Sequence, residues 1–142
     1  MIPELREDGY LPDGVHLAAF EELALRFGTG SPRRGRLLER IRRWVALARV
    51  VDAKRLFVAG SFVTAKHEPE DVDAVVLLPI DFAEQVDRGG FDALELAETL
   101  TTRQPEEIFA AEDERDWYDW VSFFTKTREP DGRTREIIEV KL

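Results

Sequence analysis

The apolar residues recur with two different periods, which divide the chain into predicted helices and strands. Spacings of three and four residues, bounded by Gly or Pro, predict helices over Ala18–Phe27, Pro32–Val51, Asp81–Asp87, Asp92–Leu100 and Asp116–Lys126. Compact apolar runs predict strands at Arg55–Ala59, Asp73–Leu78 and Ile108–Ala111, and partial alternation predicts a last, edge strand at Arg135–Leu142. Helices come first and strands mixed with helices follow, an order that indicates an α+β or α/β domain.

The longest predicted helix carries two stripes at helical spacing. Ser31 is its expected N-cap and Pro32 its first residue. The apolar stripe, which we expect to form one face, consists of Leu37, Ile41, Trp44, Val45, Ala48 and Val51. The basic stripe consists of Arg33, Arg36, Arg40 and Arg43. We interpret it as a face that is solvated or paired with the chain's own acidic residues; the alternative is a surface for an RNA end or an acidic partner.

Aromatic residues gather in the last predicted helix. They are Trp117, Trp120, Phe123 and Phe124. An aromatic stripe at helical spacing is more often part of a core than of a ligand site, so we expect core positions, with base stacking as the alternative.

Length and composition limit the class of protein. With 142 residues, we expect one domain over residues 1–142, mainly helical in 1–52 and sheet-containing in 53–142. The absence of cysteine excludes a disulfide scaffold, a cysteine nucleophile and a thiolate metal site. His16 and His67 lack zinc-ligand spacing. No apolar run approaches the ~18–20 residues of a membrane span, and the first residues do not resemble a signal peptide, so we expect a cytoplasmic protein without membrane contacts.

Charge is unevenly distributed along the chain. The net charge is −9, yet residues 26–67 carry 11 bases and 2 acids, and residues 68–119 carry 17 acids and 3 bases. The overall acid excess argues against general DNA binding. A basic segment followed directly by an acidic one is still compatible with a nucleotide held between the two.

The segment Leu56–Leu78 contains the residues that are the best candidates for a ligand-binding or catalytic site. A predicted strand runs into Gly60-Ser61, and Asp71-Val72-Asp73 opens the next strand. Alternate strand residues project to the same side, so Asp71 and Asp73 should lie together, with Val72 towards the core. Two adjacent carboxylates repel each other unless a cation lies between them, which favours a divalent cation with oxygen ligands. Gly60 permits close backbone approach, and Ser61 offers a hydroxyl and an N–H to a phosphate.

At these residues the sequence resembles the DNA polymerase β-like nucleotidyltransferase superfamily, and in particular its small stand-alone members, the minimal nucleotidyltransferases. Gly60, Ser61, Asp71 and Asp73 match the superfamily pattern; the remainder matches only in size and element order. The resemblance implies an α+β fold with a small mixed or antiparallel sheet and flanking helices. More loosely, LPDGVH, GSFVTAK and the Trp- and Phe-rich end look like a family of uncharacterised small bacterial proteins, which implies no activity.

The resemblance also implies residue roles. Gly60 and Ser61 would hold the triphosphate of a nucleotide, and Asp71 and Asp73 would bind two Mg²⁺ ions, with Mn²⁺ as a substitute. Lys66, in the loop between them, is a candidate phosphate contact, as is His67, although such loop residues are often only solvated.

The third carboxylate departs from the superfamily pattern, which generally uses an Asp flanked by apolar residues. We select Glu107, which opens the third predicted strand, as the third catalytic and metal-binding carboxylate. Glu112 and Asp113, at the far end of that strand, are the alternatives.

Two functions follow from the resemblance. The first is a Mg²⁺-dependent nucleotidyltransferase that transfers a nucleotide from an NTP to a protein, an RNA end or a small molecule; one setting for it is a toxin–antitoxin pair in which the toxin is the partner. The second is a catalytically degenerate binding module, an antitoxin or scaffold on the same fold. An aminoglycoside-type enzyme is disfavoured by the short chain.

Overall fold

The computed structural model describes residues 2–12, 14–102, 107–125 and 136–142. Its elements are, in chain order, β1 (Val15–Ala18), α1 (Phe20–Phe27), α2 (Pro32–Val50), β2 (Arg55–Ala59), the short 3₁₀ helix η1 (Ser61–Val63), β3 (Asp73–Leu77), α3 (Phe82–Asp87), α4 (Phe91–Thr102), β4 (Ile108–Ala111), α5 (Glu114–Thr125) and β5 (Ile137–Val140).

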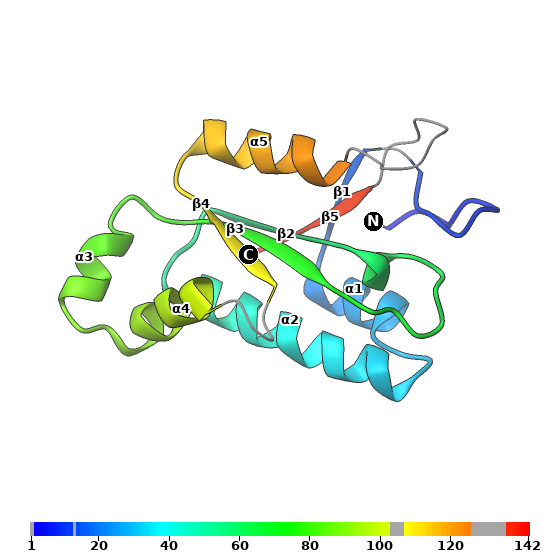
Figure 1. Cartoon of the computed structure of the whole chain (residues 1–142), viewed down its shortest axis with the longest axis horizontal. Helices are drawn as coiled ribbons and strands as arrows, with labels where there is room; N and C mark the ends of the chain where they lie inside the picture. Colours follow the sequence, from blue (N-terminus) through cyan, green and yellow to red (C-terminus); the bar gives the residue numbers. More distant parts are fainter. Residues whose placement is uncertain (1, 13, 103–106, 126–135) are drawn as a thin grey trace.

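The five strands form one mixed sheet with the order β1-β5-β2-β3-β4 (Figure 1). β2 lies at its centre and pairs antiparallel with both β5 and β3. The outer pairs, β1 with β5 and β3 with β4, are parallel. The fold is therefore α+β, with a mixed sheet and flanking helices.

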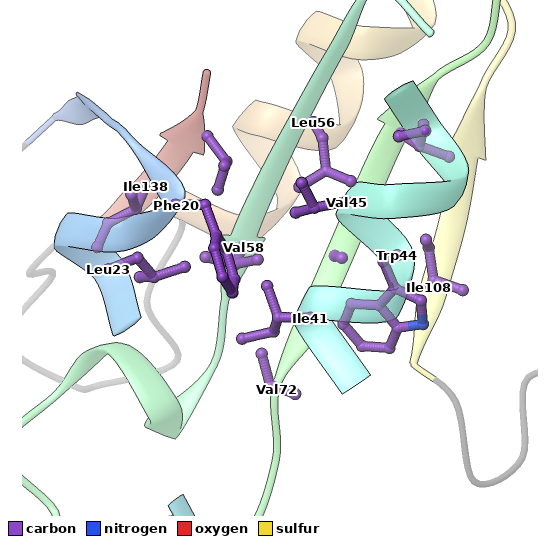
Figure 2. Close-up of a cluster of buried hydrophobic side chains, with 14 of the residues drawn as sticks. Phe20, Leu23, Ile41, Trp44, Val45, Leu56, Val58, Val72, Ile108 and Ile138 are labelled. Atoms are coloured by element: carbon purple, nitrogen blue, oxygen red, sulfur yellow. The ribbon is translucent and has the colours of Figure 1, made fainter. Parts of the chain in front are cut away.

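Helices cover both faces of the sheet (Figure 1). On one face, α1, α2 and α4 bury the larger core, part of which Figure 2 shows around Trp44, Ile41 and Val58. On the other face, α5 packs Trp117 against Phe57 and Val75. Successive strand residues alternate between these two cores, as the period of two requires. Because both faces are covered, β2 and β3 are apolar along most of their length.

The longest helix follows the sequence prediction closely. Ser31 caps α2, since its side chain accepts a hydrogen bond from the Arg34 N–H at 3.2 Å. All members of the predicted apolar stripe are buried: Leu37, Ile41, Trp44, Val45, Ala48 and Val51. On the basic stripe, Arg43 pairs with Glu95 of α4, which agrees with internal pairing for that residue.

Two expectations about the sheet need correction. The last strand, β5, is not an edge strand, because it lies between β1 and β2. Its neighbour β1 was not expected at all, and it brings part of the mainly helical segment 1–52 into the sheet. Lys126 and Arg135, which bounded predicted elements, lie outside the described residues. No helix within the described parts of the chain is long and apolar enough to cross a membrane.

Candidate functional site

A glycine turn ends the central strand and begins the candidate site. Gly60 follows β2 with φ 93° and ψ −175°, a conformation that is essentially restricted to glycine. A Cβ added at this position would lie 3.3 Å from both the backbone O and Oδ1 of Asp71. Gly60 is therefore required both for its backbone conformation and for close approach, as the sequence predicted.

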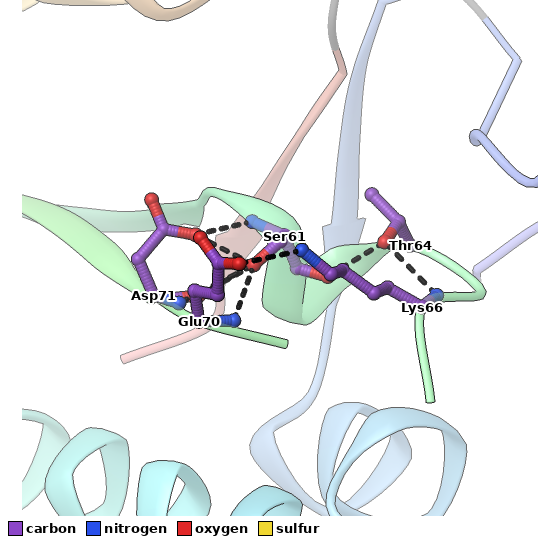
Figure 3. A network of polar contacts seen from close by, with 5 residues as sticks. All are labelled: Ser61, Thr64, Lys66, Glu70 and Asp71. Carbon is purple, nitrogen blue, oxygen red and sulfur yellow. Dashed lines mark hydrogen bonds and ion pairs between the residues drawn. The ribbon is translucent and has the colours of Figure 1, made fainter. Parts of the chain in front are cut away.

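Ser61 and Asp71 form the centre of a polar network (Figure 3). Asp71 Oδ1 accepts hydrogen bonds from the Ser61 N–H at 2.9 Å and from Ser61 Oγ at 2.6 Å. Ser61 Oγ in turn accepts from the Glu70 N–H at 3.0 Å, and the Phe62 N–H donates to Asp71 O at 3.1 Å. The network fixes the Gly-Ser turn against the segment that carries the two aspartates.

The two aspartates project to the same side, as expected. Asp73 opens β3 directly opposite Ala59, the last residue of β2, and Val72 between the aspartates is fully buried in the α2-side core. Asp71 and Asp73 both line a cavity of about 860 Å³. The same cavity is lined by the other predicted site residues Gly60, Ser61 and Lys66. Five of the six selected residues thus share one cavity, although their roles remain predictions.

The sixth residue, Glu107, is not among the residues that line the cavity. Its backbone O accepts from the Ala74 N–H at 2.9 Å, so its backbone lies one strand away from the segment that begins at Asp73. β4 instead contributes Phe109 to the cavity wall.

The two alternatives for the third carboxylate lie elsewhere. Because β3 and β4 are parallel, with Leu77 opposite Ala111, Glu112 and Asp113 follow the end of β4 that is remote from Asp73. The Asp113 carboxylate accepts a hydrogen bond from the Asp116 N–H at 2.8 Å and so caps the start of α5. About four residues of strand, on the order of 13 Å, separate these two acids from the aspartates, so the fold does not bring them together.

An acid that the sequence analysis did not select lines the cavity. Glu136, just before β5, is 4% exposed. β5 pairs with β2 through Val58 and Ile138, and this register continued by two residues places Glu136 beside Gly60. The Arg6 guanidinium lies 3.8 Å from Glu136 Oε1. Local pattern could not identify Glu136, because its position depends on the pairing of strands about 80 residues apart.

The described part of the cavity wall is strongly acidic. Among the residues that the structure describes, the charged ones that line the cavity are five acids and one lysine: Asp8, Glu70, Asp71, Asp73, Glu136 and Lys66. Lys66 lies 3.2 Å from Glu70, and Arg6 lies 3.3 Å from Asp8. This part of the wall repels a bare polyphosphate and attracts cations.

A buried arginine supports the loop behind the turn. The Arg34 guanidinium of α2 donates to the backbone oxygens of Phe27 at 3.0 Å, Phe62 at 2.7 Å and Thr64 at 2.8 Å, and also to Lys66 O. Burial lowers the pKa of Arg34, and the nearby Glu68 carboxylate opposes this effect. Arg34 is only 6% exposed, so its contacts position the loop rather than a ligand.

Aromatic side chains form another wall of the cavity. Phe109, Phe123 and Phe124 line it, and Trp120 contacts all three rings at centroid distances of 4.9 to 5.9 Å. Core positions were expected here, and Trp117 is indeed buried at 1% exposure, but Phe123 is 57% exposed. The core interpretation is therefore wrong for Phe123.

The donor set suits a hard divalent cation. Carboxylate oxygens are the ligands that Mg²⁺ prefers, and Mg²⁺ typically binds through one or two carboxylates together with substrate phosphates. Asp71 and Asp73 supply two carboxylates beside the turn at Gly60, and the Ser61 N–H and hydroxyl both donate to Asp71. Within the described residues there is no group of three His, Cys, Asp or Glu side chains that could hold a metal. Asp71 and Asp73 are the residues that would hold such a cation, with substrate phosphate oxygens as further ligands.

Comparison with known proteins gives a family but no activity. No curated protein and no solved structure matches the chain. A model described as "Family of unknown function (DUF6932)" matches residues 3–141. That match covers nearly the whole sequence, and the chain therefore belongs to the DUF6932 family.

Proposed function

We propose that the cavity binds a nucleoside triphosphate together with Mg²⁺ or Mn²⁺ and that the protein is a nucleotidyltransferase. One observation carries this proposal: Gly60, Ser61, Asp71 and Asp73 line the same cavity, with Ser61 hydrogen-bonded to Asp71. This juxtaposition matches the superfamily pattern on which the sequence resemblance rests. The polymerase β-like fold is part of the same proposal.

In this proposal, the residues of the cavity have different roles towards the triphosphate and the cation. The turn at Gly60 lets the backbone approach the triphosphate, and Ser61 holds the cation ligand Asp71 in place through its N–H and its hydroxyl. A cation held by Asp71 and Asp73 would neutralise phosphate charge in a cavity that otherwise repels it. The volume of the cavity, about 860 Å³, lies within the range of about 300–1,000 Å³ that is usual for ligand sites.

The reaction forms a bond between an acceptor hydroxyl oxygen and the α-phosphorus of the triphosphate. The bond from that phosphorus to the bridging oxygen breaks, and pyrophosphate leaves. The hydroxyl proton passes to a carboxylate of the cavity or to water. The carboxylate that takes this proton would be the third carboxylate of the site. Glu136 is a candidate for that role beside Glu107, because Glu136 lines the cavity.

We define the acceptor only by its chemical class, as a molecule that offers a hydroxyl group. A protein such as a toxin partner, an RNA end and a small molecule all offer a suitable hydroxyl. The exposed arginines of α2, among them Arg36, are a candidate surface for an acidic acceptor.

A second candidate function is a binding module that holds the metal–nucleotide complex without transfer. One observation favours it: β4 directs Phe109, and not a carboxylate, to the cavity wall. The two functions share the ligand and differ in whether the nucleotide is consumed.

Transfer of label from α-³²P-NTPs, with Mg²⁺ or Mn²⁺ and a cell extract as acceptor source, tests the proposal. We expect the wild type to produce labelled acceptor and to release unlabelled pyrophosphate, and we expect neither product with Asp71→Asn or Asp73→Asn. Asp119→Asn, on the exposed surface of α5, is the matched control and should retain transfer. Nucleotide binding without labelled product would support the binding module instead.

A further inference from the structure

An exposed ring faces the same cavity as the acidic site. Phe123 is 57% exposed and lines the cavity together with Phe109 and Phe124. A large apolar ring that is left in water forgoes the stabilisation that burial would give it. The exposed ring is therefore a surface that a flat apolar ligand would stabilise.

The neighbouring rings hold Phe123 in place. Phe123 meets Phe124 edge-on at 5.1 Å and Trp120 edge-on at 5.9 Å, with interplanar angles of 88° and 87°. Trp120 itself is fixed, because its Nε1 donates to Ala110 O at 3.3 Å. Such a cluster positions the Phe123 ring before any ligand arrives, which reduces the entropy lost on binding.

The aromatic wall and the acidic site lie on the same face of the sheet. Phe109 packs with Val75, its partner in the parallel β3–β4 register, and Asp73 precedes Val75 by two residues, so it projects to the same face. A ligand in the cavity can therefore contact both carboxylates and aromatic rings.

From this arrangement we infer that Phe123, backed by Phe124 and Trp120, is the stacking surface for the nucleobase of the bound nucleotide. The inference rests on the proposed function and adds to it where the base lies and how it is recognised. Phenylalanine rings offer a π-face and no hydrogen-bonding group, so recognition by stacking is tolerant of base identity. Purines, with the larger ring surface, bind more tightly than pyrimidines.

Binding measurements by calorimetry with three probes test the inference. The probes are Mg²⁺–ATP, Mg²⁺–tripolyphosphate, which lacks the base, and adenosine, which lacks the phosphates. We expect the wild type to bind Mg²⁺–ATP at least tenfold more tightly than Mg²⁺–tripolyphosphate. Phe123→Ala should weaken Mg²⁺–ATP binding by about 5- to 100-fold and change tripolyphosphate binding by less than about twofold.

Tyr118→Ala provides the matched control. Tyr118 lies on the same helix, is 59% exposed and does not line the cavity, so its loss should leave all three affinities unchanged. Phe123→Leu, which keeps apolar bulk without a π-face, should recover only part of the ATP affinity.

Each contrary outcome has a distinct meaning. Equal wild-type affinity for Mg²⁺–ATP and Mg²⁺–tripolyphosphate, or equal weakening of both by Phe123→Ala, would overturn the stacking inference and leave the proposed phosphate site intact. If tripolyphosphate does not bind but adenosine binds in a Phe123-dependent way, the proposed function fails and the stacking surface stands. Binding of none of the three probes would overturn both.

Discussion

Ser61 and Asp71 are joined by two hydrogen bonds to a single carboxylate oxygen. Asp71 Oδ1 accepts from the Ser61 N–H at 2.9 Å and from Ser61 Oγ at 2.6 Å. The backbone N–H of Ser61, which opens η1, thus already meets a negative charge. The same contact positions Asp71 on the cavity wall, so the Gly-Ser turn and the aspartate pair are one structural unit.

Removal of the Ser61 hydroxyl should loosen this unit without unfolding the protein. Ser61→Ala loses the bond to Asp71 and the bond that the hydroxyl accepts from the Glu70 N–H. We expect the free energy of unfolding to fall by about 1 kcal/mol and metal–nucleotide affinity to fall several-fold. Urea denaturation and calorimetry measure the two effects. Ser122→Ala, at an exposed position of α5, should change neither, and a Ser61→Ala protein with wild-type affinity would contradict the account.

Two glycine substitutions should have opposite effects. Gly60→Ala forces a Cβ into a positive-φ conformation and to 3.3 Å from Asp71 O and Oδ1, so the free energy of unfolding should fall by about 1–3 kcal/mol. Gly35→Ala lies within α2 with no atom within 4 Å of the added Cβ. Because alanine is the better helix former, stability should rise by roughly 0.5–1 kcal/mol. Thermal or urea unfolding checks both signs.

Arg34 should contribute more to stability than any exposed arginine on the same helix. Arg34→Met leaves the backbone oxygens of Phe27, Phe62 and Thr64 without their buried donor, so we expect a loss of about 3–5 kcal/mol in the free energy of unfolding. The exposed Arg36, changed to Met, is the control and should shift stability by less than about 0.5 kcal/mol. Similar losses for both variants would show that the contacts of Arg34 are not decisive.

The two candidates for the third carboxylate should differ in their importance for transfer. Glu136 lines the cavity and Glu107 does not. Glu136→Gln, which keeps the shape of the side chain, should therefore lower the rate of nucleotidyl transfer at least about tenfold, whereas Glu107→Gln should leave it within about twofold. Melting temperatures of both variants control for misfolding. The reverse order of effects would return the third-carboxylate role to Glu107.

Local sequence pattern predicted most elements to within a few residues, because continuous burial makes segments such as β2 apolar along most of their length. It missed β1, whose four residues include exposed Val15 and Leu17 and whose strand forms only by pairing with β5, some 120 residues later. The same non-local pairing made β5 an internal strand.

The candidate site was predictable where its residues are close in sequence. The turn at Gly60 and the aspartates Asp71 and Asp73 lie in one short segment of the chain, and alternation alone placed the carboxylates together. Arg34 could not be distinguished from its arginine neighbours, because its role depends on carbonyls of a distant loop. Phe123 looked like a core residue, since helical spacing reports a shared face and not how deeply that face is covered.

We propose that the cavity takes a nucleoside triphosphate only together with a divalent cation held by Asp71 and Asp73. Calorimetric titration of the protein with ATP, in the presence and absence of Mg²⁺, tests this dependence. We expect binding with Mg²⁺, little or none without it, and loss of binding in Asp71→Asn and Asp73→Asn. The first of these variants keeps an amide oxygen that can still accept the hydrogen bonds from Ser61, so the turn is preserved while the charge is removed. Binding that is independent of Mg²⁺, or that survives both substitutions, would contradict it.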